Sequence, residues 1–256
     1  MQQNQELVLG EQKRVMTEQT GVRINKYIAD AGVCSRREAD RLVEQGRVSA
    51  DGRAAEKGTR ILPGMCVTVD GKEIRQSEKK VYLAFHKPKG IVCTSEKREK
   101  DNVIDFIGYP ARITYCGRLD KDSEGLLLLT NDGSIINQMM RAANYHEKEY
   151  VVTIDRPVTK EFLKQMRTGV YLDGLDTVTR PCAVKKTAEN TFHMILTQGL
   201  NRQIRRMCEA LGCRVVKLCR IRVMNILLGD LPAGTYRELS ETELMELRKE
   251  IMSERK

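Results

Sequence analysis

The sequence predicts an α+β protein in which a small N-terminal domain precedes a larger domain built on a largely antiparallel mixed sheet with flanking helices. Strand-like and helical segments follow one another irregularly, without the steady strand–helix alternation of a parallel sheet. Asp-Gly pairs stand between extended residues at two places, which is typical of hairpins. The polar segment 76–80 separates the two groups of elements and is the predicted linker.

The small domain, 22–75, is predicted to contain two short helices followed by a small twisted sheet. Gly32 ends the first helix. The second begins with Ser35 and Glu38, which have the spacing of a capping box. The hairpins "SADGRA" and "VDGKE" follow. The polar residues 1–21, which lack the apolar core of a signal peptide, are predicted to form a disordered tail.

The larger domain, 81–256, is predicted to place helices between strands and to end in a helix that starts at Ser240. Leu126 to Leu129 are consecutive, which suits a strand buried on both faces. The predicted strands are "VYLAFHK", "RITYCGRL", "GLLLLT", "EYVVTID" and "FHMILTQG", and the predicted helices are "SIINQMMRAA", "TKEFLKQMRTG" and "RQIRRMCEALG".

The charge distribution indicates an anionic partner. The chain has 256 residues and a net charge of +9, and residues 198–222 hold seven Lys or Arg and one acid. Arg202, Arg205 and Arg206 have the spacing of one helix face, so a nucleic-acid surface is favoured over a plain solvated face. Apolar runs are far shorter than the ~20 residues of a membrane span, so no membrane partner and a cytoplasmic location are expected.

The eight cysteines fit reduced free thiols. No two have Cys-x-x-Cys spacing, and the three histidines lie near no thiol pair. A structural zinc site needs such clustered ligands, so no metal site is expected.

Arg118 and Asp120 stand directly in front of the leucine run. If 114–120 is a strand, both side chains point to one side and Leu119 to the other. From these residues alone Asp120 is equally well a turn former, and Arg118 an exposed strand residue. Three further arginines, mixed with acids, give the second helix of the small domain a modest basic surface suited to phosphate contacts: Arg36, Arg37 and Arg41.

Several segments resemble a known family. "INKYIADAGVCSRREADRLVEQGRVSADG" is similar to an S4 RNA-binding module. "HKPKGIVCT", "GRLDKDSEGLLLLTNDG", "EKEYVV" and "GLNRQIRRM" resemble, in the expected order, the motifs of the RsuA branch of rRNA pseudouridine synthases. "RAANYHEKEYVVTIDRPVT" is most similar to members that act on large-subunit rRNA.

The resemblance implies site-specific isomerisation of uridine to pseudouridine, which uses neither a cofactor nor a metal. It implies that 23S rRNA, or a large-subunit assembly intermediate, is the partner and that the protein acts as a monomer. The alternative is a non-catalytic S4-type rRNA-binding or ribosome-assembly factor, for which the small domain and the basic segment serve equally well.

The resemblance also assigns roles. Asp120 is the catalytic carboxylate, with its part as nucleophile or base left open, and Arg118 fills the space left by the flipped nucleotide. Tyr150, otherwise a core aromatic, stacks on the uracil. Arg205, otherwise a phosphate contact, pairs with Asp120. Three residues are assigned to the wall or border of the pocket: Ile204, Lys87 and Gly90.

Overall fold

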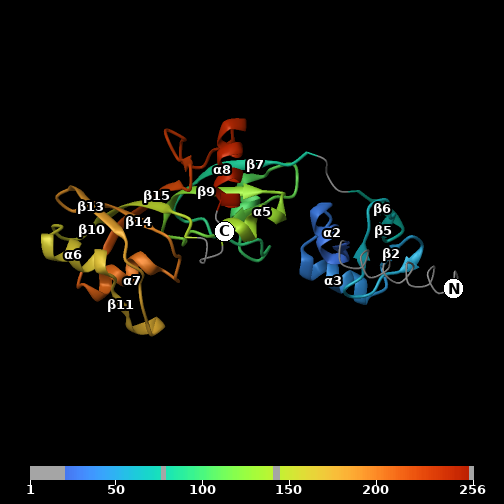
Figure 1. Ribbon diagram of the computed structural model, residues 1–256, viewed down its shortest axis with the longest axis horizontal. Helices are drawn as coiled ribbons and strands as arrows, with labels where there is room; N and C mark the ends of the chain where they lie inside the picture. Colours follow the sequence, from blue (N-terminus) through green and yellow to red (C-terminus); the bar gives the residue numbers. More distant parts are fainter. Residues whose placement is uncertain (1–20, 76–78, 141–144, 254–256) are drawn as a thin grey trace, which may run out of the picture. The chain divides into compact units, whose positions relative to one another are not determined.

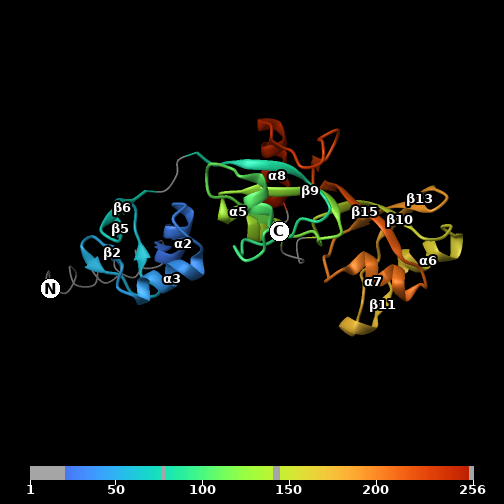
Figure 2. The ribbon, with the colours of Figure 1, turned by 180° about the vertical axis from the view of Figure 1, so that it is seen from behind.

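The structure, a computed structural model, describes residues 21–75, 79–140 and 145–253. The chain divides into two compact units, with the boundary between Lys80 and Val81. Figures 1 and 2 show their elements from opposite sides. Of the predicted tail, only Gly21 lies within the described residues, and of the predicted linker only residues 79 and 80.

The N-terminal unit packs two helices, α2 and α3, on a four-stranded sheet of order β3-β2-β5-β6, and β1 pairs with β4. Ile24 and Ile28 of α2 and Leu42 of α3 are buried against strand residues such as Val67. The bounds are β1 Val22–Arg23, α2 Ile24–Asp30, α3 Arg36–Glu44, β2 Val48–Ala50, β3 Arg53–Ala54, β4 Arg60–Ile61, β5 Val67–Val69 and β6 Lys72–Ile74.

Local sequence signals explain these elements. Asp51 and Gly52 join β2 to β3 with φ angles of 48° and 76°. A turn with two positive φ angles matches the twist of a hairpin, and Asp-Gly adopts it readily. Asp70 and Gly71 repeat this between β5 and β6. The Ser35 hydroxyl accepts a hydrogen bond from the N–H of Glu38, so α3 begins where the sequence predicts.

The C-terminal unit is built on a nine-stranded sheet of order β13-β14-β10-β15-β9-β7-β17, with β16 beside β15 and β8 beside β9. Among the described residues, the strands of this sheet pair antiparallel except β15 with β9, which confirms the predicted fold class. The bounds are β7 Tyr82–Lys87, β8 Thr114–Cys116, β9 Glu124–Thr130, β10 Lys148–Ile154, β13 Ala183–Ala188, β14 Thr191–Leu196, β15 Val215–Val223, β16 Ile226–Leu227 and β17 Tyr236–Glu238.

Strand β9 lies between two cores, which confirms that its leucines are buried on both faces. Leu127 and Leu129 join the core that holds residues of α6 and α7. Leu126 and Leu128 join the core that holds residues of α5 and α8. Helices in this unit are α4 Val103–Ile107, α5 Gly133–Met140, α6 Lys160–Thr168, α7 Gln203–Ala210 and α8 Glu241–Ser253, and β11 Tyr171–Leu172, the 3₁₀ turn η2 Asp173–Leu175 and β12 Thr177–Val178 form a small hairpin.

The predicted strand 114–120 is shorter in the structure. Strand β8 ends at Cys116, because Gly117 takes a φ of 74° that extended backbone does not have. Arg118 and Asp120 therefore lie on a loop between β8 and β9. Among the described residues no helix has the length and apolar character needed to cross a membrane.

Candidate active site

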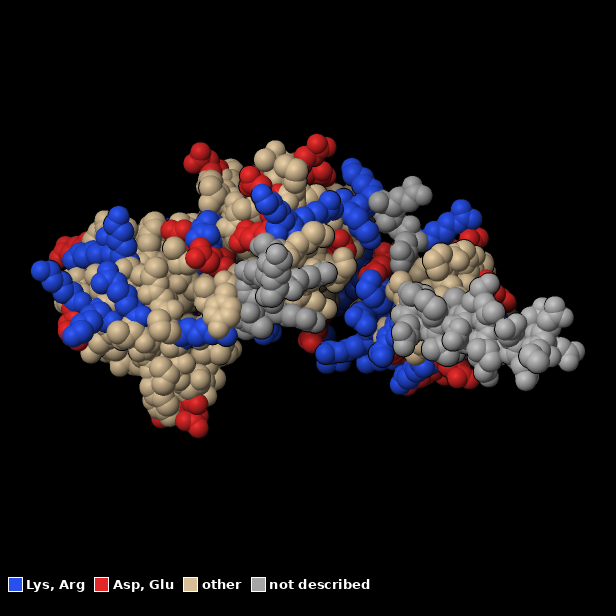
Figure 3. Space-filling model, in the orientation of Figure 1, with Lys and Arg blue, Asp and Glu red and all other residues tan. Residues whose placement is uncertain are grey.

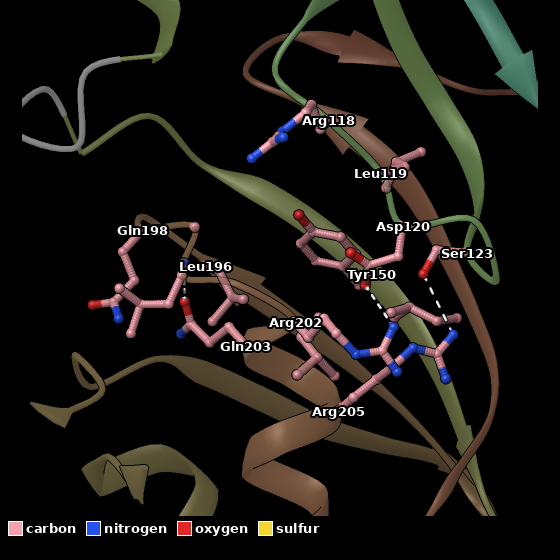
Figure 4. Close-up of a pocket in the computed structure, with 14 residues that line it drawn as sticks. Arg118, Leu119, Asp120, Ser123, Tyr150, Leu196, Gln198, Arg202, Gln203 and Arg205 are labelled. Carbon is pink, nitrogen blue, oxygen red and sulfur yellow. Dashed lines mark hydrogen bonds and ion pairs between the residues drawn. The ribbon is translucent and has the colours of Figure 1, made fainter. Parts of the chain in front are cut away.

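A cavity of about 110 Å³ opens beside this loop. That is a few times the ~30 Å³ share of one water in the liquid, so it has room for one small group. The loop after β8, strand β10 and the start of α7 bring its lining together (Figure 4). Six predicted site residues are among those that line it: Arg118, Asp120, Tyr150, Arg202, Ile204 and Arg205.

Leu119 anchors the loop that carries the two charged residues. Its side chain is buried in the core, and its N–H donates to Cys93 Sγ at 3.4 Å. The Asp120 carbonyl accepts from the N–H of Ser123 at 3.1 Å, which closes a turn before β9. Arg118 and Asp120 thus flank a fixed apolar residue and both line the cavity, although neither belongs to a strand.

The ion-pair partner of Asp120 is Arg202, with 3.9 Å between Arg202 Nη1 and Asp120 Oδ2 (Figure 4). Arg202 also lies 3.9 Å from Asp122 Oδ2. Among the described residues Arg205 makes no ion pair with Asp120, so that predicted pairing is wrong. Arg202 is the N-cap of α7 with a φ of 50°, and this turn directs its side chain to the loop.

The Arg205 side chain binds the backbone of the same loop. Its guanidinium donates to the Asp122 carbonyl at 3.1 Å, to Ser123 Oγ at 3.4 Å and to the Val215 carbonyl at 3.4 Å. The side chain is 9% exposed. Arg205 therefore holds the segment after Asp120 in place, while Arg202 meets the carboxylate.

The predicted basic face of Arg202, Arg205 and Arg206 is also wrong. Helix α7 starts at Gln203, so Arg202 is outside it, and Arg205 points into the protein. The Arg206 guanidinium donates to the carbonyl and the side-chain oxygen of Asn201 at 3.0 and 3.2 Å. The three arginines therefore have different partners: Arg202 pairs with Asp120, Arg205 binds the loop backbone, and Arg206 binds Asn201.

Tyr150 supplies the aromatic surface of the cavity. It stands on β10 between Met194 of β14 and Arg220 of β15, and its side chain is 9% exposed. Ile204 adds an apolar wall, as predicted. Gln198 and Gln203 also line the cavity and were not predicted. Both lie in "QGLNRQ". The sequence offered one signal that they could line a cavity, namely two amide side chains close to apolar residues.

Lys87 and Gly90 are not among the lining residues, which corrects their assignment to the pocket wall. Lys87 is fully buried, and its ammonium donates to the carbonyls of Pro88 and Ile91 at 2.9 and 2.7 Å. Gly90, with a φ of 89°, donates its N–H to the Lys121 carbonyl at 2.8 Å. Through this hydrogen bond the turn at Gly90 holds the backbone of the loop that carries Asp120.

The buried charged side chains near the site are all cations among the described residues: Lys87, Lys148, Arg205 and Arg220. Desolvation lowers the pKa of Lys87. Burial, followed by the Arg220 charge, lowers the pKa of Lys148 to about 8. Such a cluster favours negative charge nearby, whether from a carboxylate or from a bound phosphate.

Replacing Lys148 with Met is expected to raise the free energy of unfolding at pH 7 by about 2 kcal/mol, because a buried charge is removed while the aliphatic stem is kept. In the native protein the pKa lies below that of an unfolded lysine, so between about pH 8 and pH 10 the unfolded state binds the extra proton and stability rises with pH. Urea titrations of both proteins across that range measure this. Equal pH slopes for the two proteins would refute it.

The other predicted features are located as follows. The N-terminal unit exposes Arg36, Arg37 and Arg41 on α3, where basic atoms gather in Figure 3. Arg41 also pairs with Glu38 at 3.1 Å. All eight cysteines are free thiols. In the ranges that the structure covers, no group of His, Cys, Asp or Glu is arranged to hold a metal ion.

Comparisons with known proteins agree with this arrangement. Residues 81–210 match the RNA pseudouridylate synthase family, and residues 22–65 match the S4 domain. The dual-specificity RNA pseudouridine synthase RluF of Escherichia coli K12 is 50% identical over 92% of this chain and 81% of its own. Ribosomal large subunit pseudouridine synthase B of Bacillus subtilis is 34% identical over 88% of this chain and 95% of its own.

A crystal structure of a pseudouridylate synthase, 28% identical, superposes with a TM-score of 0.65 over 88% of this chain and 99% of that one. Sequence and fold thus agree over both units. The chain therefore belongs to the RsuA family of pseudouridine synthases, isomerases that convert uridine in RNA to pseudouridine.

Proposed function

We propose that this enzyme isomerises a specific uridine in 23S large-subunit rRNA, either free or within an assembly intermediate, and that it acts as a monomer in the cytoplasm. The relative from Bacillus subtilis is named for the large ribosomal subunit, and RluF is named as a dual-specificity enzyme. The basic charge of the chain suits a polyanionic substrate.

The observation that carries the proposal is that the Asp120 carboxylate and the Tyr150 ring line one small cavity. A base inside a duplex cannot reach such a cavity, so the target uridine must be flipped out of its stack. Tyr150 then stacks on the uracil, and Ile204 bounds the other apolar surface. Asp120 lies beside the glycosidic bond.

The isomerisation breaks the bond from N1 to C1′, turns the uracil within the cavity and forms the bond from C5 to C1′. The proton on C5 is lost to water and N1 gains a proton, so atoms and electrons balance without a redox step. The carboxylate must be ionised when the reaction begins, whether it then acts as a nucleophile or as a base. Arg202 lies 3.9 Å from the Asp120 carboxylate and can orient it, and Arg205 holds the adjoining backbone.

Exposed arginines bind the RNA backbone in this proposal. Arg118 is exposed at the cavity, and among the described residues no carboxylate lies within ion-pair distance of it. A free guanidinium can stack on a base and bind phosphate at once. Weaker backbone contacts come from Arg206, which Asn201 already holds, and from the arginines of the S4 unit: Arg36, Arg37 and Arg41.

Replacing Arg118 with Ala should reduce the slope of log affinity against log salt by about one unit, since one phosphate contact is lost. Replacing Arg206 with Ala should change the slope less, because its guanidinium is already held by Asn201. Filter binding of rRNA at several salt concentrations measures both slopes. A larger effect at Arg206 than at Arg118 would reverse the assignment.

Mapping pseudouridines in the rRNA of a strain that lacks this protein tests the substrate. The proposal expects a uridine of 23S rRNA to lose its modification and to regain it when the wild-type gene is returned. The gene encoding Asp120→Ala should not restore it. A complete set of 23S pseudouridines in the deletion strain would show that the substrate is another RNA.

A further inference from the structure

We infer that Tyr145 and Arg180 form a stacking platform for a nucleotide next to the target uridine, an inference that rests on the proposed function. Tyr145 is one of the most exposed large side chains among the described residues, with 58% of its surface accessible. The Arg180 guanidinium carbon lies 4.2 Å from the centre of the Tyr145 ring. That distance is well inside the range of a cation–π contact.

The platform adjoins the active-site cavity. The backbone N–H of Arg180 donates to Gln198 Oε1 at 2.9 Å, and Gln198 lines the cavity. Figure 4 shows Gln198 on the far side of the cavity from Asp120 and Ser123. Tyr145 lies three residues before the start of β10, where Lys148 pairs with Leu196 of β14, and Leu196 lines the cavity.

Arg180 is held on a rigid backbone. The preceding residue, Thr179, is buried and exchanges two hydrogen bonds with Val170, each 2.9 Å long. A Cβ on Gly169 would lie 2.4 Å from the Thr179 carbonyl oxygen, which shows how closely the two segments pack. The backbone at Arg180 is therefore held in place, and from it the guanidinium reaches the Tyr145 ring.

Tyr145 itself has an unusual backbone. Its φ is 52°, a left-handed conformation that few residues other than glycine adopt. Such strain concentrates at functional sites because the surrounding structure must maintain it. With Arg180 over one face and most of the side chain accessible, the ring offers a second face to a planar group.

The chemistry of the reaction supplies that group. When the target uridine leaves its stack, a neighbouring base loses a stacking partner. An exposed aromatic ring beside the cavity can replace that partner, and an adjacent arginine can reach the phosphate. The ligand is thus an unpaired nucleotide that flanks the target uridine. It is bound by stacking on the face of its base, so the hydrogen-bonding edge of the base, and with it the base identity, is not read.

The chain contains no tryptophan, which gives a direct test. Tyr145→Trp introduces one fluorophore at the platform, and a base stacked on it should quench its emission. The probes are a short RNA centred on the mapped uridine and an oligouridylate. A matched control is Tyr171→Trp, at a side chain that is 51% exposed and bonded to Asp176. Tyr171 does not line the cavity, and the protrusion that carries β11 has acidic atoms at its tip in Figure 3, so no base is expected to stack on this ring.

RNA is expected to quench Tyr145→Trp in a saturable manner and to leave Tyr171→Trp unchanged. In a series of abasic RNAs, quenching should disappear when a base flanking the target is removed. Tyr145→Ala should raise Kd about tenfold, and Tyr145→Phe should restore wild-type affinity. No quenching at RNA concentrations that saturate binding, or an unchanged Kd for Tyr145→Ala, would overturn the inference.

Tritium release by the wild-type protein, measured in parallel, separates the two claims. Release without quenching of Tyr145→Trp refutes the platform alone. Quenching without release supports the platform and refutes the proposed isomerisation of that RNA. Loss of quenching only when the target base itself is removed would assign Tyr145 to the catalytic pocket and contradict a separate nucleotide site.

Discussion

Asp120→Ala is expected to reduce turnover to below about one thousandth of the wild-type rate, because no other carboxylate lines the described cavity. RNA binding should be retained, since Arg118 and the other basic contacts remain. Release of tritium from RNA labelled at C5 of uridine measures turnover, and filter binding measures affinity.

Asp122→Ala is the matched control. Asp122 lies at the same 3.9 Å from Arg202 but is 69% exposed and does not line the cavity. The Asp122→Ala protein should keep most of the wild-type activity. If both substitutions had equal effects, the loss would reflect the Arg202 contact and the loop rather than a carboxylate in the cavity. If Asp120→Ala kept full turnover, the assignment of Asp120 would be wrong.

Gly125→Ala is expected to lower the free energy of unfolding by about 4 kcal/mol or more. Gly125 has a φ of 111° and pairs with Arg220 at the parallel contact between β9 and β15. A Cβ there would lie 2.3 Å from the Arg220 carbonyl oxygen and 2.5 Å from its nitrogen. Backbone atoms at the centre of a sheet can move aside only if hydrogen bonds between strands are broken, which lowers the stability of the fold.

Gly229→Ala gives the comparison within the same unit. Gly229 also has a positive φ, 56°, but a Cβ there meets nothing within 4 Å. Its cost should be only about 1 kcal/mol, the conformational preference of glycine alone. Urea unfolding followed by circular dichroism measures both. Similar losses for the two variants would show that β9 and β15 are not as closely paired as described.

Much of the fold could be predicted from local signals. The two Asp-Gly hairpins, the cap at Ser35 and the doubly buried leucines each follow from residue types at fixed spacing. The last helix does too, since Ser240 and Glu243 form the reciprocal capping box with bonds of 2.9 and 3.2 Å. Strand β15 was not predicted. Its charges alternate with apolar residues as in a strand, but they also belong to the basic segment 198–222, which was assigned to an anion-binding surface.

The structure brings most of the predicted site residues to one cavity, but not through the predicted contacts. The motifs identified Asp120, Tyr150 and Arg205, which do line one cavity. The partner of Asp120 depends on where α7 begins, and each residue of shift turns a helical side chain by about 100°. The left-handed φ of Arg202 decides this, and no spacing rule predicts such an angle for an arginine.

Incubation of purified wild-type protein with 23S rRNA labelled with tritium at C5 of uridine tests the central claim most directly. The account predicts tritium release that reaches a plateau at one uridine per rRNA molecule, with pseudouridine at the position lost in the deletion strain. Tight binding of the same RNA without any release would contradict it and would favour a non-catalytic rRNA-binding factor.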